Sequence, residues 1–208
     1  MKIGVIGSGH MGASLSGLLA QAGHDVVISN SRGPDSLGDL TGQRGAGRIA
    51  AGTVPEAIEH GDVVLVTVPY VAIDEVAAEG DWQGKIVVDV SNYYPQRDGA
   101  RTNPSPLSSS EIVAEKLVGA RVVKAWNTIW YRRLETQARA DGERLAVLYA
   151  GDDEEACRVV AGLIEDSGFA PVYSGTLAES RTTQEPGTPL YNVPIGEAEA
   201  RRRVAQHS

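Results

Sequence analysis

Short apolar, β-branched runs alternate with helical stretches along most of this 208-residue chain, and this alternation constrains the fold more than any other feature. Most of the runs are continuously apolar, which is typical of parallel strands covered on both faces. They lie at Lys2–Ile6, Asp25–Ser29, Gly47–Ala51, Val63–Val68, Ile86–Asp89, Arg121–Ala125, Leu145–Tyr149 and Ala170–Tyr173. Because helices join such strands through right-handed crossovers, we predict an α/β fold with a doubly wound, mostly parallel sheet.

Helix start signals mark several of the intervening segments. Pro34 suits a first helical position, and Thr53 and Ser110 suit helix N-caps. The predicted helices are Met11–Ala22, Pro34–Leu40, Val54–Glu59, Val71–Glu79, Ser110–Leu117 and Glu154–Ser167. The stretch 92–109 has three prolines and no apolar period, so we interpret it as a long loop, either a functional lid or disordered.

The chain divides unevenly into a domain and a short extension. We expect one domain over residues 1–180, because strand and helix patterns alternate up to that point. The segment after Gly175 has three prolines and no clear period. We therefore interpret residues 181–208 as a short C-terminal arm that runs into a frayed tail.

Charge and composition narrow the classes of partner. Twenty-seven acidic against nineteen basic residues give a net charge of −8, which argues against nonspecific nucleic-acid binding. No apolar run approaches the roughly 18 residues of a membrane span, and no basic leader precedes an apolar stretch. Cys157 is the single cysteine, and no His, Asp or Glu spacing suggests a metal site. We expect a cytoplasmic protein with no metal, membrane or nucleic-acid partner.

A glycine motif follows the first predicted strand and opens the first predicted helix. It reads Gly7-Ser8-Gly9-His10-Met11-Gly12 and matches G-x-G-x-x-G. In that context Gly7 permits a tight turn, Gly9 lets the backbone approach a pyrophosphate, and Gly12 lets helix and strand pack closely. The pyrophosphate would lie at the positive end of the helix. The motif therefore predicts a Rossmann-type sheet that binds a dinucleotide.

The end of the second predicted strand indicates which dinucleotide. An NAD site places an acidic residue there to bind the ribose hydroxyls, whereas this chain has Asn30, Ser31 and Arg32. Ser31 can donate a hydrogen bond to a 2′-phosphate, and Arg32 can form a charge-assisted pair with it. The alternative is a solvated surface arginine. We predict NADP.

These residues also carry a family resemblance. The segments concerned are 6–12, 22–26, 29–34, 87–89 and 150–153. The chain resembles the NADPH-dependent deazaflavin (coenzyme F420) reductase family, and it is similar to the cytosolic reductase domains of membrane metalloreductases. The resemblance implies NADP at Ser31 and Arg32, and hydride transfer to a planar tricyclic acceptor. Together with the proline-rich arm, it also implies a homodimer.

Ligands of open α/β sheets bind beyond the carboxyl ends of the strands. At those ends we expect Pro69 and Tyr70, which follow Val68, to run under the adenosine or nicotinamide ribose; the alternative is an ordinary strand exit. The side chains of Asn92 and Asn127 can bind the carboxamide or the acceptor, or they are ordinary buried turn residues. The candidate cofactor-binding residues are Gly7, Ser8, Gly9, His10, Met11, Gly12, Asn30, Ser31, Arg32, Val68, Pro69, Tyr70 and Asn92. The candidate catalytic residues are His10 and Asn127.

The aromatic residues after the sixth predicted strand leave two interpretations open. Trp126 and Trp130 offer flat faces for an aromatic acceptor, or they pack in the core. No tyrosine is followed four positions later by a lysine, a pair that would supply the proton for ketone reduction. Hydride transfer to a flavin-like ring needs mainly positioning.

We therefore predict an NADP-dependent oxidoreductase that transfers hydride between NADPH and a deazaflavin or flavin-like acceptor. The alternatives are an NADPH-dependent reductase of a quinone or another small molecule, and a non-catalytic NADP-binding sensor.

Overall fold

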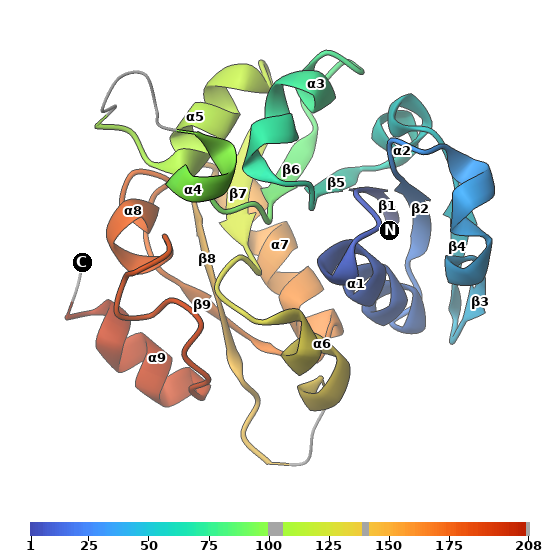
Figure 1. Ribbon diagram of the computed structural model, residues 1–208. Coiled ribbons are helices and arrows are strands. Elements are labelled where there is room, and N and C mark those ends of the chain that lie inside the picture. The colour runs from blue at the N-terminus through green and yellow to red at the C-terminus, as the bar shows by residue number, and fades with distance from the viewer. Residues whose placement is uncertain (100–105, 139–141, 207–208) are drawn as a thin grey trace.

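The computed structural model describes residues 1–99, 106–138 and 142–206, and within them nine strands form one sheet (Figure 1). The strands are β1 (Lys2–Ile6), β2 (Asp25–Ser29), β3 (Gly42–Arg44), β4 (Gly47–Ala51), β5 (Val63–Val66), β6 (Ile86–Asp89), β7 (Arg121–Ala125), β8 (Ala146–Gly151) and β9 (Ala170–Tyr173). The helices are α1 (His10–Gln21), α2 (Val54–His60), α3 (Ile73–Ala77), α4 (Pro95–Asp98), α5 (Ser109–Lys116), α6 (Tyr131–Gln137), α7 (Glu154–Asp166), α8 (Ser180–Thr183) and α9 (Glu197–Val204), with 3-10 turns η1 (Pro34–Leu40) and η2 (Tyr70–Ala72).

The strand order confirms the predicted Rossmann-type fold. The sheet runs β3-β4-β2-β1-β5-β6-β7-β8-β9. The six strands from β4 to β7 are parallel, whereas β3 and β8 are antiparallel to β4 and β7. The chain winds outward in both directions from β1, so the topological switch point lies between β1 and β5. Ligands of such sheets bind beyond the carboxyl ends of the strands at that point.

Apolar side chains on both faces of the sheet hold the helices. One core contains Leu15 of α1, Leu134 of α6 and Val160 of α7 against the strands. The other contains Ile58 of α2 and Val113 of α5, together with residues of α3. Burial on both faces explains why the strands read as continuous apolar runs rather than as alternating patterns.

Some predicted boundaries differ from the observed ones. Strand β5 ends at Val66, after which the Thr67 hydroxyl bonds the carbonyls of the neighbouring β1 end. Strand β8 extends to Gly151, because its last residues pair with the antiparallel β7. The helix expected at Val71–Glu79 is a 3-10 turn followed by the short α3.

The predicted cap of α5 is also wrong. The cap is Ser108 rather than Ser110: its side chain accepts from the Glu111 amide, while Glu111 bonds the Ser108 amide in return. This reciprocal pair satisfies two amides that would otherwise lack partners, and it sets the start of the helix.

The stretch 92–109 is only partly described. It contains the one-turn helix α4, and residues 106–108 lead into α5, while residues 100–105 lie outside the described residues.

The frayed tail is a wrong prediction as far as residue 206. Residues 197–204 form α9, whose Ala200 and Val204 are buried against Leu148 of β8 and Val172 of β9. Four-residue spacing places both apolar side chains on one helix face, and the charged residues between them obscured that short pattern. Residues 207 and 208 lie outside the described part of the chain.

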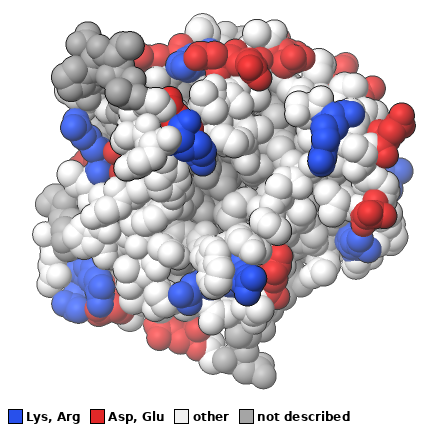
Figure 2. Space-filling model, in the orientation of Figure 1, with Lys and Arg blue, Asp and Glu red and all other residues white. Residues whose placement is uncertain are grey.

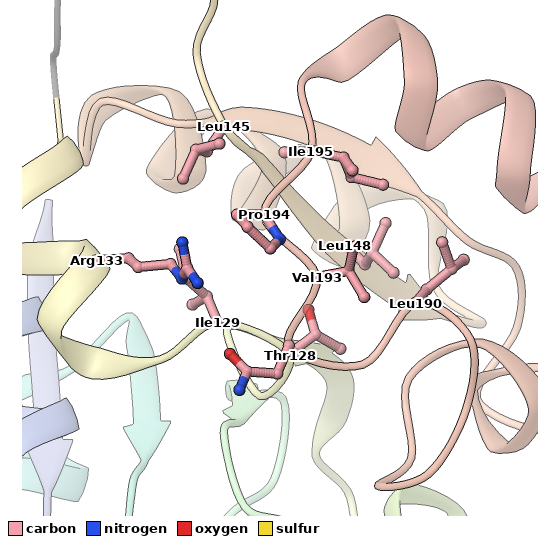
Figure 3. Close-up of a pocket in the computed structure, with 11 residues that line it drawn as sticks. Thr128, Ile129, Arg133, Leu145, Leu148, Leu190, Val193, Pro194 and Ile195 are labelled. Carbon is pink, nitrogen blue, oxygen red and sulfur yellow. The ribbon is translucent and has the colours of Figure 1, made fainter.

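The arm before α9 packs on its own sheet. The Ala146 amide donates to the Ile195 carbonyl at 2.9 Å, and Leu145 forms an antiparallel bridge with Gly196. Val193, Pro194 and Ile195 face Leu145, Leu148 and Arg133 around a cavity of about 10 Å³ (Figure 3). That space is near the lower limit for a single water molecule, so the arm is closely packed. The helices of the described residues are too short or too polar to cross a bilayer.

Candidate functional site

The glycine loop has the geometry that its sequence predicts. Gly7 lies in the left-handed region with φ 108°, and a Cβ there would lie 2.7 Å from Thr67 Oγ1. A Cβ on Gly12 would lie 2.0 Å from the Gly7 carbonyl oxygen. A Cβ on Gly9, in contrast, would meet no atom within 4 Å. The first and last glycines allow close packing, whereas Gly9 leaves open space above the backbone at the start of α1.

A cavity of about 590 Å³ lies against this loop at the switch point. It is lined by Ile6, Gly7, Ser8, Gly9, Asn30, Ser31, Arg32, Val54, Thr67, Val68, Pro69, Ala72, Glu75, Val76 and Glu79. The structure thus brings the glycine loop, the end of β2 and the segment after β5 together around one space. We call it the first cavity.

Asn30 connects the glycine loop to the segment after β2. Its Nδ2 donates to Ser8 Oγ at 2.9 Å and to Ser36 Oγ at 3.0 Å, and its Oδ1 accepts from the Arg32 amide at 2.9 Å. These bonds fix the backbone that carries Ser31 and Arg32. The Arg32 side chain is exposed, and no carboxylate in the described part of the chain forms an ion pair with it. It is therefore available to an anionic ligand.

The opposite wall carries two of the three residues expected after β5. Val68 and Pro69 line the first cavity, and their contact with a ribose stays a prediction. Tyr70 instead packs edge to face against Tyr93, with ring centroids 5.3 Å apart.

A second cavity, of about 190 Å³, lies beyond the carboxyl ends of β6 and β7. It is lined by Met11, Val90, Asn92, Trp126, Asn127, Thr128, Ile129, Trp130, Tyr131, Tyr191 and Asn192. Trp126 is fully buried, whereas Trp130 is 46% exposed. Trp126 therefore packs in the core. Trp130 is partly exposed with the Arg132 guanidinium over its ring, 5.2 Å from the centroid, and its contact with an acceptor stays a prediction. Figure 2 shows that the middle of this side of the molecule is hollowed and lined by uncharged side chains.

The two asparagines of the second cavity bind each other. Asn92 Nδ2 donates to the Asn127 carbonyl oxygen at 2.9 Å, and Asn127 Nδ2 donates to Asn92 Oδ1 at 3.0 Å and to the Gln184 carbonyl oxygen at 2.8 Å. Asn127 is 4% exposed, and its Oδ1 has no hydrogen-bond partner among the described residues. Trp126 precedes it with φ 57°, in the left-handed region, which strains the backbone at this turn.

A buried ion pair supports the loop that carries Asn92. Lys124 Nζ lies 3.3 Å from Asp89 Oδ2, and both side chains are fully buried. Asp89 also accepts from Ser91 and Ser110 at 2.6 and 2.5 Å. The pair was not predicted, although Asp89 ends an otherwise apolar strand and Lys124 lies between apolar residues of β7. Asp89 and Lys124 are direct partners in the β6–β7 register.

His10 does not line either cavity and contacts the wall of the second one. Its ring stacks on that of Tyr131 at the start of α6, a helix that the sequence analysis missed. Its assignment as a catalytic residue stays a prediction.

The arm contributes a residue that the sequence analysis did not single out. The Tyr191 hydroxyl forms a short hydrogen bond with the Tyr94 hydroxyl and lies 3.4 Å from Asn92 Nδ2. Burial, and then the bond to Tyr94, raise the pKa of Tyr191, so its phenol stays protonated. The tyrosine is 99 residues from Asn92 in sequence, so no local pattern links them.

Comparison with known proteins agrees with this geometry. A family model described as NADP oxidoreductase, coenzyme F420-dependent, matches residues 2–93. A hypothetical protein of Sinorhizobium meliloti, SMa0349, is 35% identical and superposes over 95% of this chain and 96% of its own, with a TM-score of 0.85. Residues 2–93 belong to the F420-dependent NADP oxidoreductase family.

Two further relatives extend the comparison. A proposed F420-dependent NADP reductase of Arthrobacter sp. FB24 shares the fold at 23% identity, with a TM-score of 0.73 over 95% of this chain and all of that one. Metalloreductase STEAP3 of Rattus norvegicus is 32% identical over 191 residues, which are 88% of this chain and 36% of the relative. The chain spans about a third of the length of the metalloreductases that it matches.

The family model covers β1 to the end of β6 and so contains the whole first cavity. Most of the second cavity is built from residues after 93. The family model therefore describes the half of the chain that forms the first cavity, and it does not cover most of the second cavity.

Proposed function

We propose that this chain binds NADPH across both cavities and passes hydride to a deazaflavin or flavin-like ring in the second one. The proposal rests on the positions of the two cavities, which lie on either side of the glycine loop. Gly7 and Gly9 line the first cavity, and Met11, two residues on, lines the second. A dinucleotide whose pyrophosphate crosses this segment would place its adenosine end on one side and its nicotinamide end on the other.

The residues of the first cavity fit NADP. The open space at Gly9, which a Cβ would fill, lets phosphate oxygens reach the amides at the start of the 12-residue α1. Ser31 and Arg32 are held by Asn30 at the cavity wall, where they would bind the 2′-phosphate.

In the second cavity, this chain's residues orient two planar rings and limit contact with water. Bound NADPH would supply the hydride from its nicotinamide ring. Met11 and Val90 give apolar walls, and the partly exposed Trp130 adds an aromatic ring that Arg132 covers on one side. Asn127 presents its amide oxygen to a carboxamide or an acceptor ring, and Asn92 holds Asn127 in place through two hydrogen bonds. Hydride transfer between stacked rings needs close, fixed positioning, and these walls supply it.

The family's description names coenzyme F420, and this supports a deazaflavin or flavin as the acceptor class. The test is steady-state oxidation of NADPH with FMN, a deazaflavin, menadione and a set of ketones and aldehydes. We expect turnover with the tricyclic acceptors and negligible reduction of carbonyl compounds.

The same panel separates the alternatives. Turnover with menadione alone would replace the proposal by a quinone reductase, and fast carbonyl reduction without flavin activity would contradict it. Tight NADPH binding with no turnover on any acceptor would indicate a sensor.

A homodimer is a second proposal, and it rests on the family resemblance. Light scattering of the full chain tests it, and a monomer at all concentrations would contradict it. The arm packs on its own sheet within one chain, so the test does not depend on the arm crossing to a partner.

A further inference from the structure

Tyr191 brings the C-terminal arm into the second cavity. The amide of the next residue, Asn192, donates to the Thr128 carbonyl oxygen at 3.0 Å, and the Tyr191 amide donates to the Thr188 carbonyl oxygen at 3.1 Å. The backbone on both sides of the tyrosine is therefore fixed. Its side chain lines the cavity beside Asn92 and Asn127.

The hydrogen bonds among Asn92, Tyr191 and Tyr94 leave one donor for a ligand. Asn92 Oδ1 accepts a hydrogen bond from Asn127, which fixes the orientation of the Asn92 amide. Asn92 Nδ2 then donates to the Asn127 carbonyl oxygen and to the Tyr191 hydroxyl oxygen. The Tyr191 oxygen thus accepts from Asn92. When Tyr94 donates to the same oxygen, both lone pairs are used, and the hydrogen of Tyr191 is the group left for the cavity.

Asn127 supplies the complementary group. Its Nδ2 is used twice, whereas its buried Oδ1 has no partner among the described residues. A buried acceptor without a partner lowers the stability of the folded state, and such groups require an explanation. A ligand that donates a hydrogen at this wall would provide one.

We propose that the Tyr191 hydroxyl and Asn127 Oδ1 act as a donor–acceptor pair that binds an –NH–C(=O)– edge of the hydride acceptor. The proposal rests on the proposed function and deepens it. The pyrimidinedione ring of flavins and deazaflavins carries this edge, and simple quinones and ketones do not. Tyr191 is then the residue of the arm that selects the acceptor class.

The same contact favours reduction. Hydride addition to the central ring places an electron pair in the ring system, and the carbonyl oxygens of the pyrimidinedione become more negative. A donor bonded to one of those oxygens binds the reduced ring more strongly than the oxidised ring. Tyr191 keeps its own proton throughout, in agreement with its raised pKa.

The test is equilibrium dialysis of three neutral planar probes against the protein saturated with NADP⁺. Riboflavin has the complete edge, 3-methylriboflavin lacks the N–H, and phenazine is a tricycle without the dione. The proteins are the natural chain, Tyr191→Phe, and Tyr173→Phe as a matched control whose hydroxyl bonds Gly151 away from the cavity.

We expect Tyr191→Phe to weaken riboflavin about two- to tenfold, which is the usual contribution of one hydrogen bond. N3-methylation should weaken binding to the natural chain by a similar factor. Phenazine should bind both proteins equally, and Tyr173→Phe should change none of the three affinities.

The possible outcomes distinguish a wrong acceptor class from a wrong role of Tyr191. If the natural chain binds no riboflavin, both the proposed acceptor class and the proposed role of Tyr191 are contradicted. If riboflavin binds and Tyr191→Phe leaves its affinity unchanged, only the inference is contradicted. Equal weakening of riboflavin and phenazine would also contradict it, because the tyrosine would then act through cavity shape.

Discussion

The imidazole ring of His10 lies parallel to the phenol ring of Tyr131, with centroids 4.1 Å and planes 11° apart. His10 begins α1, and Tyr131 begins α6 and lines the second cavity. A hydrogen bond of 3.2 Å from Ser14 to Glu135 continues the contact one turn further along both helices. The glycine loop is therefore held directly to one wall of the second cavity.

Replacing both stacked rings should reveal this coupling. A stacked aromatic pair contributes about 0.5–1.5 kcal/mol beyond its buried area. We expect a coupling energy of about 1 kcal/mol from urea unfolding of His10→Ala, Tyr131→Ala and the double variant. Tyr131→Phe keeps the ring and should behave like the natural chain. Strictly additive effects of the two alanines would show that the stack stabilises nothing.

Two glycines of α1 should respond oppositely to alanine. A Cβ at Gly12 meets the Gly7 carbonyl at 2.0 Å, whereas a Cβ at Gly17 meets nothing within 4 Å. Gly17→Ala should stabilise the helix by about 0.5–1 kcal/mol, because alanine has the higher helix propensity. Gly12→Ala should shift the loop, lower the melting temperature and abolish NADPH binding in a fluorescence titration. An unchanged NADPH affinity for Gly12→Ala would contradict the loop assignment.

Loss of Lys124 should destabilise the protein strongly. Breaking a buried ion pair on one side leaves an uncompensated charge, here on Asp89, and typically costs about 3–5 kcal/mol. Lys116→Met removes a partly exposed pair with Asp74 and should cost about 0–1 kcal/mol. Denaturant unfolding of Lys124→Met and Lys116→Met measures both. Similar losses for the two variants would contradict the role given to the buried pair.

His24 should make stability depend on pH. Burial, together with the neighbouring Met1 ammonium group, lowers the pKa of His24 despite its hydrogen bond to Asp166. The unfolded chain, with a His pKa of about 6.5, then binds more protons than the folded chain. The free energy of unfolding therefore has its full value above about pH 6.5, and it decreases as the pH falls below that value.

Chemical unfolding at about pH 7.5 and about pH 5.5 measures this dependence. We expect a smaller decrease for His24→Gln than for the natural chain. An equal decrease in both proteins would place the titrating group elsewhere.

Much of the fold follows from local sequence patterns. Continuous apolar runs identified eight of the nine observed strands, because burial on both faces leaves a strong signal. The missed strand, β3, has three exposed residues and no such signal. Helix α6 was missed for a related reason, because Leu134 is its one fully buried residue. The short β3 and α6 are fixed by tertiary contacts rather than by periodicity.

The candidate site likewise contains residues that a sequence motif predicts and residues that no local pattern predicts. Gly7, Gly9, Gly12 and the segment 30–32 could be predicted, because a contiguous motif and its spacing carry the chemistry. Tyr191 joins Asn92 and Tyr94 only through the path of the arm. Its neighbours in sequence contain no motif, and contacts between such distant residues leave no local pattern.

The affinities of Arg32→Ala for NADPH and NADH decide whether Arg32 binds the 2′-phosphate of the nucleotide. A charge-assisted pair contributes about 1.5–3 kcal/mol, so NADPH affinity should fall about ten- to hundredfold, while weak NADH binding hardly changes. Ser31→Ala should act in the same direction more weakly, and the exposed Arg158→Ala should change neither affinity. Equal weakening of both nucleotides by Arg32→Ala, or no change in either, would contradict the assignment of Arg32 to the 2′-phosphate.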